Sequence, residues 1–584
     1  FTVARICEQG RSMRVNNIIS PYSTQREDQN KNGTLNTTSH RISEERKHAR
    51  NVRTYSFRVL ADLLYRHPQF EFHMYSNDLV YIMEPLLLRL SNECGASTPP
   101  VILQVVASLS SSYHLLLTFL SVEESTSCLK FVWEILKAEV ASEQSRVMCL
   151  DIAENLVNHV ENDNVRKKNL AKQILVKHSK ELFESLQILV SHPNCSSKCM
   201  KSQLNLNLER TFLLISRLSH TLGGKNAVFA TIISLKRLAR SPRLDEGMLS
   251  KLLSAFSTAF LDSSAIMNSK DVEKFWALIT PFLCKVRNVK VRSELVHALS
   301  ILANNLDSLW VSTKILQKLN STAKNSLDDI NFEMRLESYE KLTTNWFCGN
   351  SEQNMKAIIF QTFYDLGSSD FALCQAAQST IQNFIDALSM PLCKDTCTLI
   401  FAEIVLPGIK RSMNSTEKSK RAVAIYLVGY LAKTQPHYAP GLSILSKIDS
   451  ETDFFINITH LQSHRRSRAL TQLKVASTSL ECHLSTILDY YIPIVLTCLA
   501  DPVSNVAATA VSVVRQISSK LPWPVFKDIL RKISRKIFSS SRQNGAYLHA
   551  FASVLENLGH FLNLEDEGKF LDLFKEFYPK LMKL

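Results

Sequence analysis

Apolar residues recur at helical spacing from about residue 50 to the C-terminal end, which predicts helices almost throughout this part of the chain. No stretch shows a convincing strand pattern. The residues before this part are mainly polar and have neither a helical nor an alternating period, for example from Gln25 to Gly33. We therefore expect a mostly flexible polar segment over residues 1–46 and packed helices over residues 47–584.

The predicted helices come in pairs. In the clearest pair, a first helix begins with Ile487 to Leu496 and contains Pro493. A turn follows at Asp501-Pro502, and a second helix from Asn505 to Ile517 has its branched and small residues on one face.

The same plan recurs elsewhere, because Pro281 precedes Ala298 by 17 residues, just as Pro493 precedes Ala510. Similar pairs are expected near residues 84–87, 357–360 and 405–409. This plan resembles the HEAT repeat, in which a helix pair cannot bury its apolar face alone and stacks on its neighbours. The sequence thus predicts an all-α fold, an α-solenoid of HEAT-like helix pairs; the alternative is an ordinary all-α domain with chance periodicity.

The composition supports this fold class and narrows the chemistry. The chain of 584 residues has only 14 Gly and 17 Pro, too few for the loops of an all-β chain or of a Rossmann or barrel enzyme. Its 13 Cys are scattered, which favours reduced thiols over a disulfide framework. The clusters His192/Cys195/Cys199 and Cys393/Cys397 lack the four ligands of a structural zinc site, so we interpret them as buried or incidental thiols.

No catalytic, cofactor or membrane signature is found. The sequence Gly223-Gly224-Lys225 lacks both the earlier glycine and the following Ser or Thr of a phosphate loop, and we expect an interhelical turn there. The longest apolar runs have eleven residues, well short of the roughly 20 that span a bilayer. We therefore predict a protein that is not an enzyme and has no cofactor or membrane contact.

Charge is the most informative property of the surface. The chain has 68 Lys and Arg against 54 Asp and Glu, a net charge of +14. Between Lys410 and Arg542 the balance is 19 against 8, a net charge of +11. Such a surplus favours an anionic partner, most often nucleic acid, although any single cluster could also be a solvated helix face.

The candidate residues for binding RNA or another partner lie in four clusters of this basic segment. In the last cluster, from Lys527 to Lys536, the basic pairs Arg531-Lys532 and Arg535-Lys536 repeat after four residues and so share one strip of a helix. The full set of candidates is Lys410, Arg411, Lys418, Lys420, Arg421, His464, Arg465, Arg466, Arg468, Arg531, Lys532, Arg535 and Lys536.

The segment from Asp453 to Leu470 cannot be one unbroken helix. Phe454, Ile458 and Leu461 share a helical face, and continuing the helix would place two arginines on this apolar face. We therefore predict a break near Ser463.

In the new helix after this break, Leu470 and Leu473 face the core, whereas Arg465, Arg468 and Gln472 face outward. The alternative is a buried arginine paired with Asp453.

This segment also carries a family resemblance. Its run Asp-Phe-Phe-x-Asn-Ile-x-His-Leu-Gln-x-His-Arg-Arg-x-Arg-Ala-Leu resembles the central signature of the "down-regulated in metastasis" family. That family is the large HEAT-repeat component, numbered twenty, of the U-three small nucleolar RNA-associated proteins. Because residue 1 is Phe, we expect the chain to be an internal piece of such a protein.

The resemblance implies a non-catalytic scaffold of the small-subunit processome, located in the nucleolus of the nucleus. It implies a role in pre-rRNA processing and small-subunit rRNA maturation. The implied partners are precursor rRNA, the U-three small nucleolar ribonucleoprotein and other processome proteins. It leaves open whether the arginines of the signature bind RNA or lock neighbouring repeats together.

Two other functions remain possible from the sequence. One is an importin-type transport receptor, also a HEAT solenoid, although such receptors usually have acidic inner surfaces and this chain is basic. The other is a kinase- or phosphatase-type scaffold, for which the chain has no kinase signature.

Overall fold

The computed structural model describes residues 35–67, 76–93, 101–112, 125–138, 141–161, 165–191, 201–241, 243–323, 326–478, 483–539, 544–560 and 567–581. The chain forms two compact units. The N-terminal unit comprises residues 1–282 and 286–310, and the C-terminal unit comprises residues 283–285 and 311–584.

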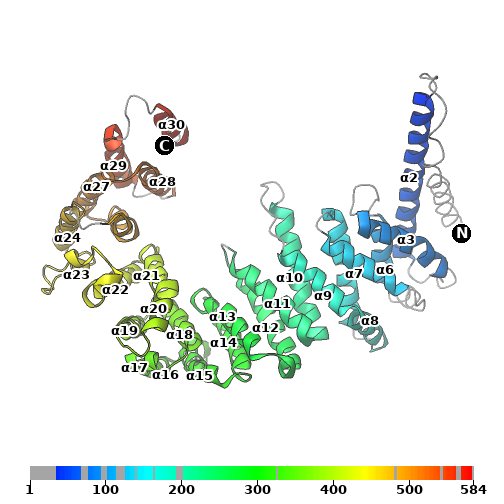
Figure 1. Cartoon of the computed structure of the whole chain (residues 1–584), viewed down its shortest axis with the longest axis horizontal. Coiled ribbons are helices and arrows are strands. Elements are labelled where there is room, and N and C mark those ends of the chain that lie inside the picture. Colours follow the sequence, from blue (N-terminus) through cyan, green and yellow to red (C-terminus); the bar gives the residue numbers. More distant parts are fainter. Residues whose placement is uncertain are drawn as a thin grey trace. The chain divides into compact units, whose positions relative to one another are not determined.

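The N-terminal unit is helical in all of its described elements (Figure 1). They are α2 (Leu35–Arg66), α3 (Ser76–Glu93), α4 (Val101–Ser111), α6 (Ser125–Lys137), α7 (Glu143–Val160), α8 (Val165–Lys177), α9 (Ser179–Ser191), α10 (Lys201–Leu222), α11 (Gly224–Ala239), α12 (Glu246–Ser263), η2 (Ser264–Ile266), α13 (Ser269–Ile279), η3 (Thr280–Cys284, which ends in the other unit), α14 (Val289–Ala303) and η4 (Asp307–Leu309).

The C-terminal unit continues the same plan, with one small hairpin. Its elements are α15 (Trp310–Leu319, whose first residue belongs to the other unit), β1 (Thr322–Ala323), β2 (Ser326–Ile330), α16 (Phe332–Glu340), α17 (Thr344–Cys348), α18 (Glu352–Asp365), α19 (Phe371–Ala387), α20 (Lys394–Ile400), η5 (Phe401–Val405), α21 (Leu406–Met413), α22 (Lys418–Thr434), η6 (Pro436–Tyr438), η7 (Ser443–Leu445), α23 (Phe454–Asn457), α24 (Ser463–Ala476), α25 (Leu484–Thr486), η8 (Ile487–Tyr491), α26 (Ile492–Cys498), α27 (Ser504–Ser518), α28 (Trp523–Ser539), α29 (Asn544–Leu555), η9 (Glu556–His560) and α30 (Glu567–Leu581).

Within the N-terminal unit the helices form two layers. Helix α4 packs against α2 and α7, and α12 packs against α10 and α14, so that these helices make one layer. Helices α3, α6, α9 and α11 pack in succession to make the other. Consecutive helices such as α6 and α7 also contact each other, and the apolar side chains between the layers, including Trp133 and Phe256, are buried.

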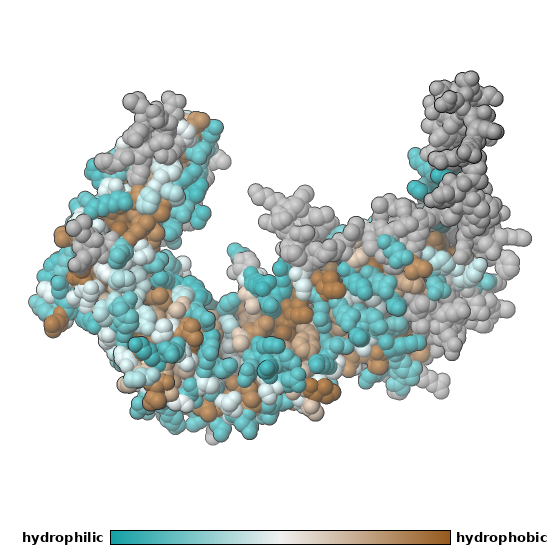
Figure 2. Space-filling view, in the orientation of Figure 1, coloured by the Kyte–Doolittle hydropathy of each residue, from teal (hydrophilic) through white to brown (hydrophobic). Residues whose placement is uncertain are grey.

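The C-terminal unit repeats this arrangement. Helix α19 packs against α16 and α22, and α27 packs against α24 and α29, while the pairs α21/α22, α26/α27 and α28/α29 connect the layers. Hydrophilic residues cover most of the visible face of this unit, with smaller hydrophobic areas between them (Figure 2). The predicted all-α fold, a solenoid of HEAT-like helix pairs, is confirmed.

The prolines that mark the first helices have a local structural effect. Pro407 and Pro493 are each the second residue of a helix, and each helix follows a π-helical turn, η5 or η8. The residue before each proline donates its N–H to the carbonyl five residues back, Phe401 or Ile487. Because proline has no N–H and crowds the preceding turn, the helical hydrogen bonds shift register there instead of breaking.

Two glycines form the predicted interhelical turn between α10 and α11. Gly223 and Gly224 have φ values of 61° and 83°, in the left-handed region that favours glycine. The two glycines therefore allow the chain to turn between α10 and α11. This agrees with the expectation of an interhelical turn, which was based on the incomplete phosphate-loop motif.

Two sequence expectations are corrected. The expectation of no strand is wrong at residues 322–330, where β1 and β2 pair antiparallel with Thr322 opposite Ile330. The two strands have only two and five residues, too short to give a detectable alternating pattern.

The predicted boundary at residue 46 also does not coincide with the start of a helix, because α2 already begins at Leu35. Residues 44–48 of this helix are exposed, so α2 does not need apolar residues at these positions. Residues 1–34, the rest of the predicted flexible segment, lie outside the described residues.

Close packing inside the C-terminal unit predicts the effect of one substitution. A Cβ added at Gly429 of α22 would lie 2.6 Å from the Cβ of Phe455 in α23. We expect Gly429→Ala to lower the free energy of unfolding by about 1–3 kcal/mol, because the overpacked helices must move apart. Urea unfolding followed by circular dichroism measures this change.

Gly545→Ala is the matched control, because no atom lies within 4 Å of an added Cβ there. It should leave stability unchanged or raise it by up to about 1 kcal/mol through helix propensity. Equal effects of the two substitutions would contradict the close approach of α22 and α23.

Candidate nucleic-acid interface

The candidate cations lie on four helices of the C-terminal unit. Lys410 and Arg411 lie on α21, and Lys418, Lys420 and Arg421 lie on α22. The four signature residues between His464 and Arg468 lie on α24, and the four candidates between Arg531 and Lys536 lie on α28. The structure therefore places them on several helix pairs rather than in one pocket, and their individual contacts decide which could bind a ligand.

Arg466 is held entirely by protein atoms. Its Nε and Nη2 donate to the two carboxylate oxygens of Asp501 at 2.8 and 3.0 Å. Its Nη1 donates to the carbonyls of His460 and Leu461 at 2.8 and 2.7 Å. The side chains of Arg466 and Asp501 are only 14% and 12% exposed, so the pair connects α24 to the turn of the following helix pair.

Arg421 and Arg292 occupy the equivalent position in their helices. Each is the fourth residue of a second helix, as Arg466 is. Nη1 of Arg421 donates to the carbonyls of Ser415 and Thr416 at 2.8 and 2.7 Å, and Nη1 of Arg292 donates to Val286 at 2.9 Å. An arginine in this position therefore satisfies the carbonyl groups of the loop that enters its own helix.

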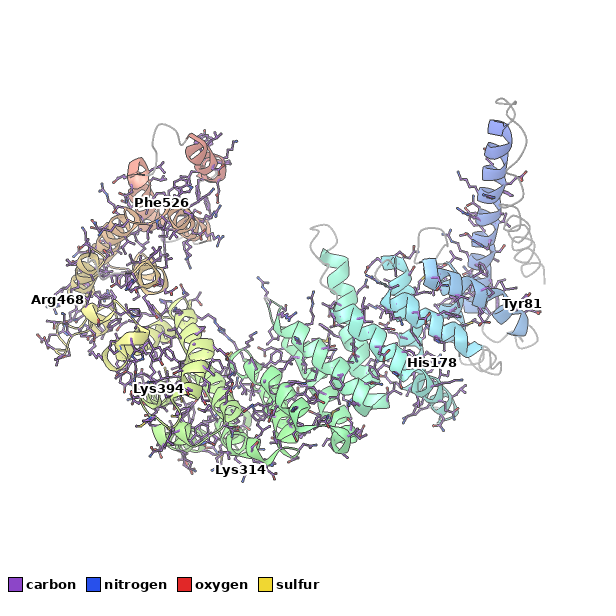
Figure 3. All side chains as sticks on the ribbon, in the orientation of Figure 1. Tyr81, His178, Lys314, Lys394, Arg468 and Phe526 are labelled. Carbon is purple, nitrogen blue, oxygen red and sulfur yellow. The ribbon has the colours of Figure 1, made fainter. Side chains whose placement is uncertain are left out.

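The other arginines of the signature hold the preceding loop. Nη2 of Arg465 lies 3.8 Å from a carboxylate oxygen of Glu451, and Arg468 (Figure 3) donates to the carbonyl of the same residue. Gln472 donates to the carbonyl of Thr452 at 3.2 Å. In this structure Arg465, Arg466 and Arg468 thus contact neighbouring loops and the next repeat.

The signature segment breaks where the sequence predicted. Helix α23 ends at Asn457 and α24 begins at Ser463, and Leu470 and Leu473 are fully buried. The predicted apolar face does not extend to Leu461, which is 91% exposed because the chain leaves the helix before reaching it.

The alternative pairing of an arginine with Asp453 is wrong. Asp453 caps α23 by accepting from the N–H of Ile456 at 3.1 Å, and its ion pair is with Lys433 at 3.0 Å. Its second oxygen also accepts from the N–H of Lys447 at 3.1 Å. The carboxylate is only 1% exposed, and these contacts compensate for its burial.

Lys410 and Arg531 also have acidic partners. Nζ of Lys410 lies 2.8 Å from Asp489 and 5.4 Å from the ring centre of Tyr490, whose pKa is raised to about 12 by burial and by that aspartate. Arg531 forms a bidentate pair with Glu576 of α30 at 2.7 and 2.9 Å. These partners lie 79 and 45 residues away along the chain, so no local sequence pattern indicates them.

Seven candidates remain. The side chains of six of them make no ion pair or hydrogen bond with any residue that the structure describes; five of these six are exposed, and Lys420 is half-buried. Lys536 is exposed as well. The six are Arg411, Lys418, Lys420, His464, Lys532 and Arg535.

The described part of the chain offers no obvious centre for other chemistry. Within it, no group of three or more His, Cys, Asp or Glu could hold a metal ion, and no helix is long and apolar enough to cross a membrane. A cavity of about 10 Å³ between α26, α27 and α28 is lined by six apolar side chains and has room for about one water. Cys393 and Cys397 are buried, as predicted, whereas the cluster of His192, Cys195 and Cys199 lies outside the described residues.

Residues 12–417 match the model of the family described as U3 small nucleolar RNA-associated protein 20, N-terminal. Two proteins named U3 small nucleolar RNA-associated protein 20 are similar to the chain. The one from Schizosaccharomyces pombe is 26% identical over 293 residues, which is 49% of this chain and 12% of that protein. The one from Saccharomyces cerevisiae is 20% identical over 366 residues, 60% of this chain and 14% of that protein. The chain thus spans only about an eighth of the length of these relatives.

A solved structure of the karyopherin Kap121p, bound to the SUMO protease Ulp1p, is also similar. It is 14% identical, with 90% of this chain and 53% of that chain covered, at a TM-score of 0.24. A likeness at this TM-score carries no argument about function.

The contacts of Arg466 predict a large loss of stability on its removal. We expect Arg466→Ala to lower the free energy of unfolding by about 2–4 kcal/mol, because Asp501 would lose its partner in a mostly buried position. Urea unfolding of both proteins measures the difference.

Arg535→Ala serves as the control, since Arg535 is exposed and makes no ion pair with the described residues. It should change stability by no more than about 0.5 kcal/mol. If both variants unfolded at the same urea concentration, Arg466 would not connect the repeats.

Proposed function

Because the chain belongs to the family of U3 small nucleolar RNA-associated protein 20, we propose that it is a scaffold segment of the small-subunit processome. In this role it supports nucleolar processing of precursor rRNA and maturation of 18S-type rRNA. The observation that carries the proposal is the family match over residues 12–417. The proposed role is non-catalytic, and the proposed partners are precursor rRNA, the U-three small nucleolar ribonucleoprotein and other processome proteins.

The mechanism that fits the fold is multivalent binding. A solenoid presents many helix ends and loops along one surface, and several weak contacts on a single chain act together. The cations of the C-terminal unit without internal partners would attract phosphate groups without reading base sequence, and each neutralised phosphate would release counterions.

The contacts divide the candidate cations by role. The side chains of Arg421, Arg466 and Arg531 contact carbonyl or carboxylate groups of the chain itself. If these arginines bound RNA instead, those carbonyl and carboxylate groups would lose their partners. Lys532 and Arg535 face outward on α28 and would lose no protein contact with a described residue. We therefore assign phosphate binding to Lys532 and Arg535, and repeat-to-repeat contacts to the arginines of the signature.

The importin-type alternative receives less support. Transport receptors usually have acidic inner surfaces for basic cargo, whereas this chain has a net charge of +14. Direct binding of the GTP form of the nuclear-transport GTPase would favour that alternative, because only a receptor should bind it.

Phosphate binding by α28 predicts a change in salt dependence. Full-length protein with Lys532→Gln and Arg535→Gln should bind a structured precursor-rRNA fragment with a less steep plot of log affinity against log salt. The slope should fall by about 1.4 to 1.8, since each lost phosphate contact removes about 0.7–0.9. Filter binding at a series of salt concentrations measures it.

The matched control neutralises two other exposed lysines of the same unit, Lys314 and Lys394 (Figure 3). Its slope should equal that of the unchanged protein. If the two double variants reduced the slope equally, the effect would come from net charge alone and not from α28.

The processome role itself predicts which RNA is bound in cells. Ultraviolet crosslinking of the tagged full-length protein, followed by sequencing of the attached RNA, should enrich the small-subunit precursor rRNA and the U-three RNA. Crosslinked peptides should come from the segment between Lys410 and Arg542. Recovery of transport factors without rRNA enrichment would refute the proposal.

A further inference from the structure

Two cysteines far apart in the sequence meet in the C-terminal unit. Cys348 is the last residue of α17, and Cys393 is the residue immediately before α20. Both α17 and α20 pack against α19, which brings the two positions together. Their sulfur atoms are 2.7 Å apart, although 45 residues separate them in the chain.

This distance is close to that of a covalent bond. A disulfide has an S–S length of about 2.05 Å, so only a small movement separates the two thiols from bonding distance. Cys348 is half-buried, whereas Cys393 is only 6% exposed. The pair thus combines a partly exposed cysteine with a buried one, and their sulfur atoms are in direct contact.

The third nearby cysteine has a different position. Cys397 lies one turn further along α20 and is fully buried. Since the three sulfurs do not form a group that could hold a metal ion, oxidation is the chemistry that their arrangement favours. Cys397 also provides a control within the same cluster.

We propose that Cys348 and Cys393 are a modification site that forms a reversible disulfide with a hydroperoxide as oxidant. Cys348 attacks the peroxide oxygen to give a sulfenic acid, and with hydrogen peroxide the leaving group departs as water. The sulfur of Cys393 then attacks the sulfenic sulfur, forming the S–S bond and releasing a second water. Two thiols and one peroxide thus give one disulfide and two waters, and a dithiol reductant reverses the bond.

The environment of the thiols sets the expected rate. Burial, and then the contact with Cys393, raises the pKa of Cys348 to about 11, and burial also raises the pKa of Cys393. Because the thiolate is the reactive form, both thiols react slowly at neutral pH. We therefore expect the bond to form over minutes to hours.

The disulfide would act on the stability of this unit. It would close a loop that contains α18 and α19 and would connect the end of α17 to the start of α20. A closed loop restricts the unfolded chain and therefore favours the folded state. Oxidation should raise the melting temperature of the C-terminal unit by about 5–10 °C.

The test uses the full chain, treated with hydrogen peroxide, blocked with N-ethylmaleimide and digested without reductant. Mass spectrometry should find the peptides of Cys348 and Cys393 joined, with the mass of two hydrogen atoms lost, and separated again by dithiothreitol. Cys397→Ser should retain this crosslink, and Cys348→Ser should lose it together with the gain in melting temperature.

The unchanged protein alone can overturn the proposal, so the test does not depend on the folding of any variant. If peroxide oxidised other cysteines while both of these stayed reduced, the pair would not be a disulfide site. If the reduced protein bound zinc stoichiometrically through these thiols and was thereby protected, a metal site would replace it.

Discussion

The structure depends on one constraint: the described helix pairs bury their apolar faces by packing against neighbouring pairs. The side chains between the two layers of each unit, such as Phe256 and Leu295, are buried by helices from more than one pair. Close approach of neighbouring helices then limits which residues fit. At Gly408 and Gly429 an added Cβ would lie 2.4 and 2.6 Å from the side chains of Phe363 and Phe455. Stacking, rather than any single helix, therefore determines the stability of the unit.

The same constraint explains how the chain uses its positive charge. Stacked repeats leave loop carbonyls and acidic turn residues that need donors, and an arginine at the fourth position of a second helix provides them at Arg292, Arg421 and Arg466. Some of the Lys and Arg side chains are thus used for contacts within the protein, and others lie on its surface. Among the described candidates, Lys532 and Arg535 belong to the surface part, and their side chains make no ion pair that an anionic partner would have to replace.

The family relationship is indicated by two separate parts of the chain. The family match covers residues 12–417, whereas the resemblance that the sequence analysis identified lies between Asp453 and Leu470. The arginines of that segment contact the neighbouring loop and the next repeat, so the conspicuous sequence of the segment fits a role in joining repeats. The proposed RNA contacts would then come from residues outside this segment.

The sequence by itself determined the fold class, the helix pairs around Pro281 and Pro493, the glycine turn at Gly223 and the break before Ser463. These features depend on local periodicity, on proline and glycine geometry and on the cost of placing charge on an apolar face. It could not determine which cations are free, because the partners Asp501 and Glu576 lie 35 and 45 residues away in other helix pairs. The sequence also did not indicate that Cys348 contacts Cys393, because this contact depends on how α17 and α20 pack against α19. Contacts between distant segments have no local signal, and for this reason only the tertiary structure decided them.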